Sequence, residues 1–205
     1  MRKQFVYSRL LVLAAVPALA AAATYQLDPA HSAAQFTVRH MMVSNVKGNF
    51  TKVSGTVEFD PKNLAGSRVE AVIDATSVDT REPKRDAHLK SADFFDVANF
   101  PTITFRSRKI EAAGQGKYKV TGDLTIRGVT KEAVLDVDGP TPEIPSGPGM
   151  FRAGAEATTH INRKDFGVSW SRAMDSGGVV VGDEVTISLD VEMVRKAPAP
   201  PATAK

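Results

Sequence analysis

Apolar and polar residues alternate with a period of two along almost the whole chain after residue 24. The alternation is clearest over 117–127 and 184–194, where one face is apolar and the other is polar or charged. Such a period is typical of β-strands with one buried face. Weaker copies of the pattern predict further strands near Tyr25 and over 34–40, 52–60, 68–75, 102–110, 132–138 and 151–161.

The predicted strands are joined mainly by short connections that contain Gly, Pro, Asn or Asp, such as 60–63 and 113–116. Short connections favour antiparallel neighbours, because a parallel crossover needs a dozen or more residues. An all-β chain of about eight antiparallel strands can close into a barrel or fold into a sandwich. We also expect one short helix from Pro83 to Ser91 and an exposed loop rich in Pro and Gly over 139–149.

The two ends of the chain differ from its body. Residues 1–23 begin with basic residues and continue into an apolar run, 10–23, that ends in small residues. This layout predicts a cleaved secretory signal peptide, since the run is shorter than the roughly twenty residues that span a bilayer. Residues 196–205 are rich in Pro and Ala and predict a disordered tail. A single domain is therefore expected over 24–195.

The formal net charge of +3 suggests an acidic partner such as nucleic acid. Residues 1–23, however, hold three of the 26 basic residues and none of the 23 acidic ones, so the remaining chain has 23 of each. Its basic residues are interspersed with acids, and we expect no nucleic-acid partner. The chain has no Cys, which excludes disulfides, thiolate sites and a lipid-modified N-terminal Cys.

Asp28, His31 and Ser32 bring the residue types of a catalytic triad close together. They lie at the start of a strand, without the Gly-x-Ser-x-Gly turn of a hydrolase, and a local turn in which Ser32 bonds nearby is the favoured interpretation. The four His residues form no close pair with metal-ligand spacing. We therefore predict no catalytic residue, no metal site and no cofactor.

Three Phe residues, Phe94, Phe95 and Phe100, fall within seven residues outside a regular strand. Exposing each would cost roughly 1.5–3 kcal/mol, so they must be buried. They either plug one end of a barrel or line the mouth of a pocket for an apolar ligand. The strand at 151–161 places Ala on one face, and these small side chains leave a volume that either a ligand or a Phe from the opposite wall fills.

The run Arg85-Asp86-Ala87-His88-Leu89-Lys90-Ser91-Ala92-Asp93-Phe94-Phe95-Asp96 resembles the YceI-like family of exported lipid-binding proteins. Further similar segments are Tyr25-x-x-Asp28-x-x-His31-Ser32, 99–105, 122–131, Ile161-Asn162-Arg163-x-Asp165-Phe166-Gly167 and 181–185. Together they span about residues 24–195, in order. The joint signal is strong because the spacing also matches.

The resemblance implies an extended antiparallel eight-stranded lipocalin-like barrel with one short helical segment, located in the periplasm. It also implies that the lumen holds a long isoprenoid lipid, a polyisoprenoid or a quinone-like amphiphile. Contact with a membrane and formation of a homodimer are compatible with that role. The expected ligand-binding residues are Phe36, Val38, His40, Phe50, Ile73, Phe94, Phe95, Phe100, Phe105, Leu124, Ile126, Arg163, Phe166 and Trp170.

Polar groups at the mouth would select the lipid head group, and His40, Arg163 and Asp165 are the candidates. For Arg163 a structural ion pair with Asp165 or another acid is an equal alternative. We expect Trp170, four residues after Phe166, to lie beside it on a strand face. Two other functions stay open: an enzyme that modifies such a lipid with His40 or His88, and a stress-response interaction module without a ligand.

Overall fold

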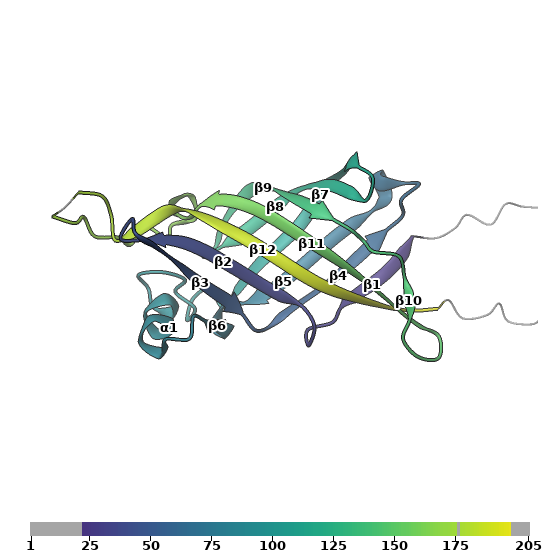
Figure 1. The fold of residues 1–205 in the computed structure, drawn as a ribbon, viewed down its shortest axis with the longest axis horizontal. Coiled ribbons are helices and arrows are strands. Elements are labelled where there is room, and N and C mark those ends of the chain that lie inside the picture. Colours follow the sequence, from purple (N-terminus) through teal and green to yellow (C-terminus); the bar gives the residue numbers. More distant parts are fainter. Residues whose placement is uncertain (1–21, 176, 198–205) are drawn as a thin grey trace, which may run out of the picture.

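The computed structural model describes residues 22–175 and 177–197 (Figure 1). The strands are β1 (Ala23–Leu27), β2 (Ala33–His40), β3 (Ser44–Phe50), β4 (Val53–Phe59), β5 (Arg68–Asp74), β6 (Val78–Asp79), β7 (Thr102–Gly114), β8 (Lys117–Ile126), β9 (Val129–Asp138), β10 (Ile144–Pro145), β11 (Met150–Asn162) and β12 (Val181–Lys196). The helices are η1 (Leu64–Gly66), η2 (Ala75–Ser77), α1 (Pro83–Lys90) and η3 (Arg163–Phe166). Segments 1–21 and 198–205, where we expect most of the signal peptide and the tail, lie outside the described residues.

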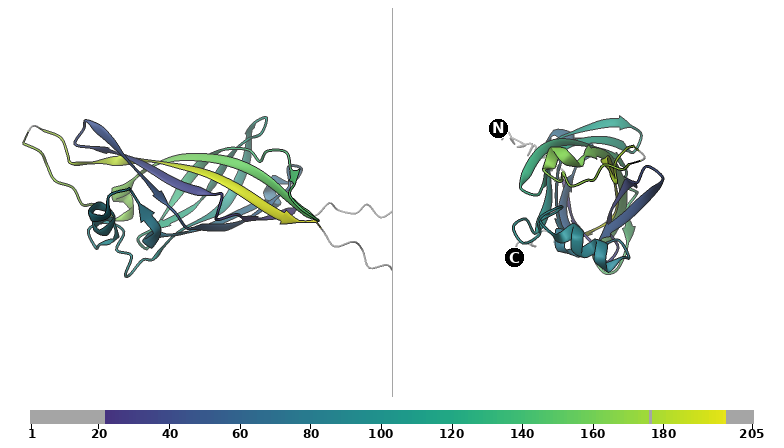
Figure 2. Two further views of the ribbon diagram at one scale, coloured as in Figure 1. Left: turned by 60° about the horizontal axis from the view of Figure 1, so that its bottom comes forward. Right: turned by 90° about the vertical axis from the view of Figure 1, so that its left-hand side faces the viewer.

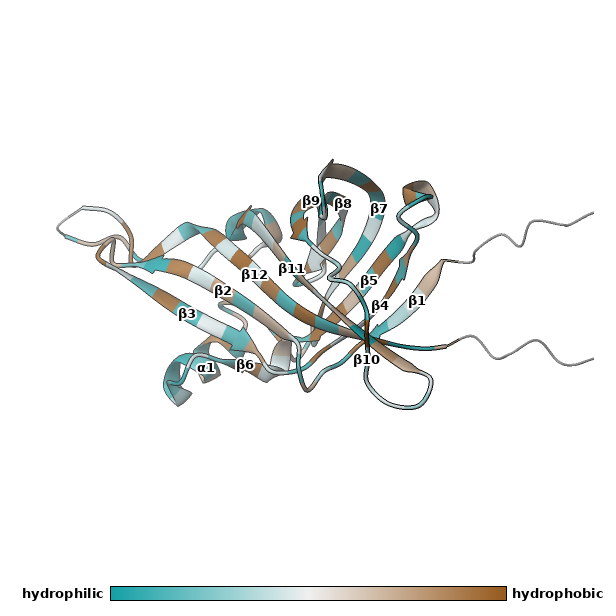
Figure 3. Ribbon diagram, turned by 45° about the vertical axis from the view of Figure 1, so that its right-hand side comes forward, coloured by the Kyte–Doolittle hydropathy of each residue, from teal (hydrophilic) through white to brown (hydrophobic). Residues whose placement is uncertain are grey.

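Eight strands form a closed ring in the order β1, β4, β5, β7, β8, β9, β11, β12 and back to β1, with every pairing antiparallel. The predicted eight-stranded antiparallel barrel with one short helix is therefore confirmed. Strands β2, β3 and β6 continue the sheet from β12. Figures 1 and 2 show an elongated barrel with α1 near one end and β10 at the other, and Figure 3 shows the alternation of hydropathy as coloured bands along β12.

Strand β12 closes the barrel. Its residues pair with β11 over the full span Met150–Asn162. On its other side it pairs first with β2, up to Asp190, and then with β1 at Met193 and Val194. One strand of sixteen residues thus joins three others, and its inner face becomes a wall that runs the length of the barrel.

Strand β3 was not predicted from the sequence. Lys47, Gly48 and Asn49 interrupt the apolar alternation, so the pattern gives no strand there. Gly48 has a packing reason: a Cβ on it would lie 2.2 Å from Cζ of Phe36. The ring of Phe36 therefore occupies the place where a side chain of β3 would stand.

The predicted helix is present as α1, Pro83–Lys90. Pro83 occupies the first turn, and the side chain of the N-cap residue Glu82 accepts a hydrogen bond from the amide of Lys84. Asp86 accepts from the amide and hydroxyl of Thr80, which joins the helix to the end of β6. No helix within the described residues is long and apolar enough to cross a membrane.

The sequence predicts an exposed loop over 139–149. In the structure this loop also makes specific contacts with two strands of the barrel. Its Glu143 accepts hydrogen bonds from the hydroxyl of Tyr25 and from the guanidinium of Arg195. Tyr25 is 5% exposed, and this burial is the largest cause of its raised pKa. The hydrogen bond from Arg195 is the largest cause of the lowered pKa of Glu143. The loop is thereby fastened across the end of the barrel opposite α1.

Arg163, at the start of η3, holds the segment after β11 in place. It is 5% exposed. Its Nε donates to the carbonyl of Gly182, and its two terminal nitrogens donate to the carbonyls of Val168, Trp170 and Val181 and to the carboxylate of Asp183. These five acceptors match the five N–H groups of a guanidinium. Burial lowers the pKa of Arg163, and the charge of Asp183 opposes that effect.

We predict that Arg163→Met lowers the free energy of unfolding by about 3 kcal/mol, because it leaves buried carbonyls and Asp183 without their donor. The matched control is Lys164→Met, which removes the other cation that contacts Asp183. The side chain of Lys164 is 43% exposed. That change should cost less than about 1 kcal/mol. Urea unfolding of both variants measures the difference, and equal losses would contradict the structural role of Arg163.

We predict that Glu143→Gln destabilises the protein by about 1–2 kcal/mol at pH 7, because it removes a charge-assisted contact with Arg195. The pKa of Glu143 is lowered from its usual 4.5, so its contribution is complete above that value and is lost as the pH falls through the lowered pKa. The melting temperatures of the wild type and the variant should therefore converge in acid. Glu111→Gln, in an exposed pair with Lys109, is the control with little effect at either pH.

Candidate functional site

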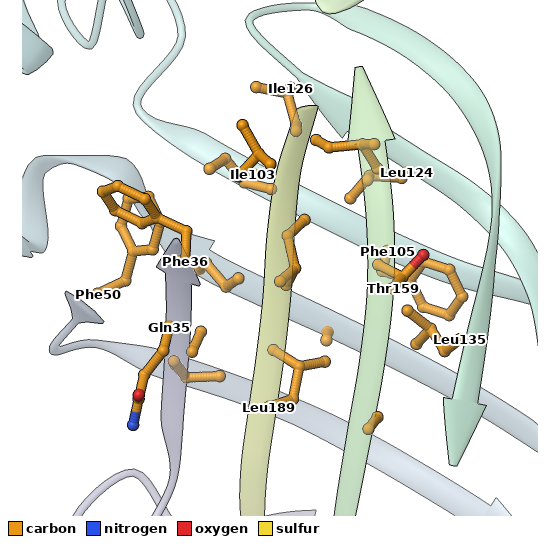
Figure 4. Close-up of a pocket in the computed structure, with 18 of the residues that line it drawn as sticks. Gln35, Phe36, Phe50, Ile103, Phe105, Leu124, Ile126, Leu135, Thr159 and Leu189 are labelled. Atoms are coloured by element: carbon orange, nitrogen blue, oxygen red, sulfur yellow. The ribbon is translucent and has the colours of Figure 1, made fainter. Parts of the chain in front are cut away.

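The interior of the barrel contains a cavity of about 410 Å³. Its wall is formed mostly by aliphatic and aromatic side chains that point inward from the strands of the ring and from β2 and β3 (Figure 4). Volumes between 300 and 1,000 Å³ are usual for small-molecule pockets. The cavity can therefore hold an apolar ligand without opening the barrel.

The cavity is long and narrow. Along β12 it is lined by residues from Val181 to Met193. A strand of that length extends for about 40 Å, which corresponds to about 30 Å along the axis of a barrel whose strands tilt by 35–45°. A volume of 410 Å³ spread over this length has the shape of a tube, which suits a linear chain better than a compact molecule.

Of the residues expected to bind a ligand, all except Phe100 line this cavity. They are Phe36, Val38, His40, Phe50, Ile73, Phe94, Phe95, Phe105, Leu124, Ile126, Arg163, Phe166 and Trp170. Phe100 lies instead against the turn between β8 and β9, where a Cβ on Gly128 would come within 2.5 Å of its ring. Contact of the lining residues with a ligand stays a prediction.

The sequence-based list missed much of the wall. Alternate residues of β12, including Val185, Ile187, Leu189 and Val191, line the cavity, and the clear alternation over 184–194 was a signal that could have identified them. Tyr25 and Tyr118 line it as well. Neither Tyr carries a sequence signal that separates a cavity wall from a filled core.

Aromatic rings gather at the α1 end of the cavity. The ring centroids of Phe94 and Trp170 are 5.3 Å apart, and the ring of His88 lies 5.0 Å from each. Phe95 packs edge-on against Phe50 at 5.6 Å. Phe94 and Phe95 therefore close this end of the barrel and also line the cavity. The segment combines the two arrangements that were expected as alternatives, a plug and a pocket wall.

Trp170 lies outside any strand. It follows η3, which ends at Gly167 with a positive φ of 74°, so the prediction that Trp170 lies on a strand face is wrong.

The small side chains of β11 face the cavity. Ala155 and Ala157 line it, whereas Ala153 packs with Tyr25 and Met193 in a separate apolar cluster near the other end. Open volume, rather than a Phe from the opposite wall, thus lies beside Ala155 and Ala157.

The Arg and His side chains that line the cavity lie at the α1 end. Arg39, His40, Arg85 and His88 all contribute to the lining there. All five donors of Arg163 are used within the protein, so its role is structural, and its acidic partner is Asp183 and not Asp165. Asp165 is exposed and does not line the cavity. Of the three head-group candidates, His40 is the one that lines the cavity without having its side chain committed to a hydrogen-bond network like that of Arg163.

Asp28, His31 and Glu192 form a cluster with metal-ligating side chains on the outside of the barrel. A guanidinium nitrogen of Arg152 donates to the carboxylates of both Asp28 and Glu192. The hydrogen bond from Arg152, and after it those from His31 and the amide of Ala30, hold the pKa of Asp28 well below its usual range. Ser32 bonds to the backbone of Glu192, across the sheet and not locally as expected. The cluster already holds a cation, and its geometry is that of a structural ion pair.

Comparison with known proteins agrees with this fold and cavity. A UPF0312 protein of Vibrio parahaemolyticus is 38% identical over 174 residues, which cover 82% of this chain and 89% of that protein. The crystal structure of BcnA from Burkholderia cenocepacia is similar with a TM-score of 0.69 and 29% identity, over 83% of this chain and 99% of that one.

A structure described as a polyisoprenoid binding domain from Saccharophagus degradans has a TM-score of 0.60 over 86% of this chain and 99% of that one. Its identity of 17% makes this a likeness of fold. The sequence model of the YceI-like domain matches residues 25–193, which is most of the chain. The protein whose barrel is described above therefore belongs to the YceI-like domain family.

Proposed function

We propose that this protein is a periplasmic carrier that holds a long-chain isoprenoid lipid, a polyisoprenoid or a quinone-like amphiphile, in its barrel. The observation that carries the proposal is the continuous apolar tube from the α1 end to the β10 end. A tube of this length and composition excludes water from a linear hydrocarbon chain along its whole extent. A chain with polar groups at regular intervals would leave them without partners there.

The energetics of such binding are simple. Each CH₂-sized group moved from water into an apolar site contributes about 0.8 kcal/mol. A prenyl chain that buries many such groups in a preformed tube needs few polar contacts for tight binding. The likeness of fold to a polyisoprenoid binding domain is consistent with this class of cargo.

The orientation of the cargo follows from the distribution of polar groups. The α1 end offers His40, Arg39, Arg85 and His88, whereas the opposite end is covered by the loop that carries Glu143. We infer that the polar head lies at the α1 end and that the tail extends toward β10. His40 is the residue proposed to bond with the head group.

The proposed location in the periplasm is supported by the signal-like residues 1–23. A carrier in that compartment takes its lipid from a membrane and returns it there, so that transient contact with a membrane is part of the proposal. A homodimer is compatible with the same role. Fractionation of host cells tests the location.

We predict that the protein purified from its host carries an isoprenoid lipid, which native mass spectrometry and organic extraction would identify. Added prenyl lipid should change the fluorescence of Trp170, the single tryptophan, because its ring lines the cavity. Absence of any co-purified lipid together with an unchanged Trp170 signal would contradict the proposal. Chemical conversion of the lipid during incubation, lost in His40→Ala or His88→Ala, would instead support an enzyme.

We predict that Ala157→Leu blocks the middle of the tube and weakens the binding of long prenyl lipids by about tenfold, while short ones still bind. The added side chain enters open volume, so the melting temperature of the empty protein should not fall. The matched control is Thr158→Leu, the next residue of β11, whose exposed side chain points away from the cavity. Competition with prenyl chains of different lengths measures the effect, and equal affinities for both variants would contradict a tube through Ala157.

A further inference from the structure

The turn between β2 and β3 is the most exposed apolar site among the described residues. Met41 is 46% exposed, Met42 50% and Val43 76%. Other exposed large apolar side chains, such as Val72, Val134 and Ile144, stand singly. Single exposed apolar residues are ordinary, but three in succession at a tip are typical of a surface that contacts an apolar partner.

The same turn has an unfavourable backbone. The amide of Val43 donates to the carbonyl of His40, and the two central residues, Met41 and Met42, have positive φ of 48° and 60°. Hairpin turns with positive φ at both central positions favour Asn and Gly, which adopt this conformation with less strain than Met. Met is unfavourable at these two positions because the backbone has a positive φ and because the apolar side chains are exposed to water. Residues that are unfavourable for two independent reasons at one place point to a function.

A second loop packs against this turn. The amide of Met41 donates to the carbonyl of Val180, 2.9 Å away. A Cβ on Gly178 would lie 3.0 Å from Cγ of Met42 and 3.5 Å from the methyl of Met174. We call the two segments, 41–43 and 174–180 without residue 176, the apolar tip. Figures 1 and 2 show both segments projecting beyond the barrel at the α1 end.

The charges beside the tip are mainly positive. Arg39, Lys47 and Arg172 are exposed, against the exposed acids Asp175 and Glu184, which gives a net charge of +1. The guanidinium of Arg39 lies directly below the tip, where it donates to the carbonyl of Met42 at 3.0 Å. Asp183, nearer the barrel, is already paired with Arg163 and Lys164. Apolar side chains with cations beside them match the acyl and phosphate layers of an anionic bilayer.

The tip is continuous with the mouth of the cavity. His40, which precedes the first segment, and Val180, the last residue of the second, line the cavity, and so do Arg39 and Val46. A surface held at this tip would therefore face the end of the tube at which the polar head of the cargo is proposed to lie. A second copy of the chain fits less well, because a symmetric contact would bring the cations of both tips together.

We propose that the apolar tip inserts Met41, Met42 and Val43 into the surface of an anionic phospholipid bilayer and so places the cavity mouth against the membrane. This inference rests on the proposed carrier function, which gives the membrane contact its role. The test measures membrane binding of the protein with an empty barrel, so the carrier function and the membrane contact can fail separately.

The test is flotation of the protein with vesicles of equal parts phosphatidylethanolamine and phosphatidylglycerol. Met41→Asn/Met42→Gly replaces the tip with residues that suit the turn, so the fold and the melting temperature should be kept. We expect this variant to lose about tenfold in vesicle affinity. The matched control, Ile144→Ser, removes a side chain that is 61% exposed at the opposite end and should bind like the wild type. Vesicles of phosphatidylcholine alone should bind the wild type more weakly.

A second readout places the contact at the tip. Because the chain has no Cys, Met42→Cys and Ile144→Cys can each carry one environment-sensitive fluorophore. The label at 42 should shift to the emission of an apolar environment when vesicles are added, and the label at 144 should not. Equal shifts at both positions, or undiminished flotation of the tip variant, would overturn the proposal. Sedimentation showing that the tip variant abolishes a dimer, with vesicle binding unchanged, would assign the tip to a second copy.

Discussion

Closure of the sheet through β12 is the constraint on which the rest of the structure depends. An open sheet with one apolar face would expose both that face and two edges. Because β12 pairs with β11 on one side and with β2 and then β1 on the other, its inner residues become a continuous wall. The length of this strand sets the length of the cavity. The small side chains of β11, Ala155 and Ala157, then keep that cavity open instead of filled.

The two ends of the barrel are closed by different physical means. At the β10 end, Glu143 joins Tyr25 and Arg195 through charge-assisted hydrogen bonds across a loop. At the α1 end, aromatic rings around Phe94 and Trp170 pack over the cavity, and the buried Arg163 fixes the backbone of the neighbouring segment. The α1 end also carries the cations and the exposed turn. The molecule therefore has one end with cationic groups and aromatic rings and one end that a loop crosses, which is the asymmetry that the proposed amphiphilic cargo would require.

Several elements could be predicted because their signal is local. The alternation over 117–127 and 184–194 reports strands, and Pro83 marks the start of α1. Strand β3 could not be predicted, since Gly48 is selected by the ring of Phe36 on the neighbouring strand. The same holds for Arg163, whose five acceptors come from residues 168–183, and for Glu143, whose partners lie at opposite ends of the sequence. Phe100 was expected in the cavity because composition alone does not distinguish the aromatic rings on its wall from those behind it.

By itself, the sequence determined an antiparallel all-β fold through strand periodicity, and the order of its motifs indicated the family and, through that resemblance, the barrel. Both signals are properties of the linear chain. The tertiary structure decided whether the interior is filled or hollow, which polar side chains are free, and which turn projects beside the mouth. These depend on distances between residues far apart in the sequence. Arg163 and His40 show the difference: both line the cavity, but the donors of Arg163 are all used by backbone carbonyls and Asp183, so its place in the fold settles its role.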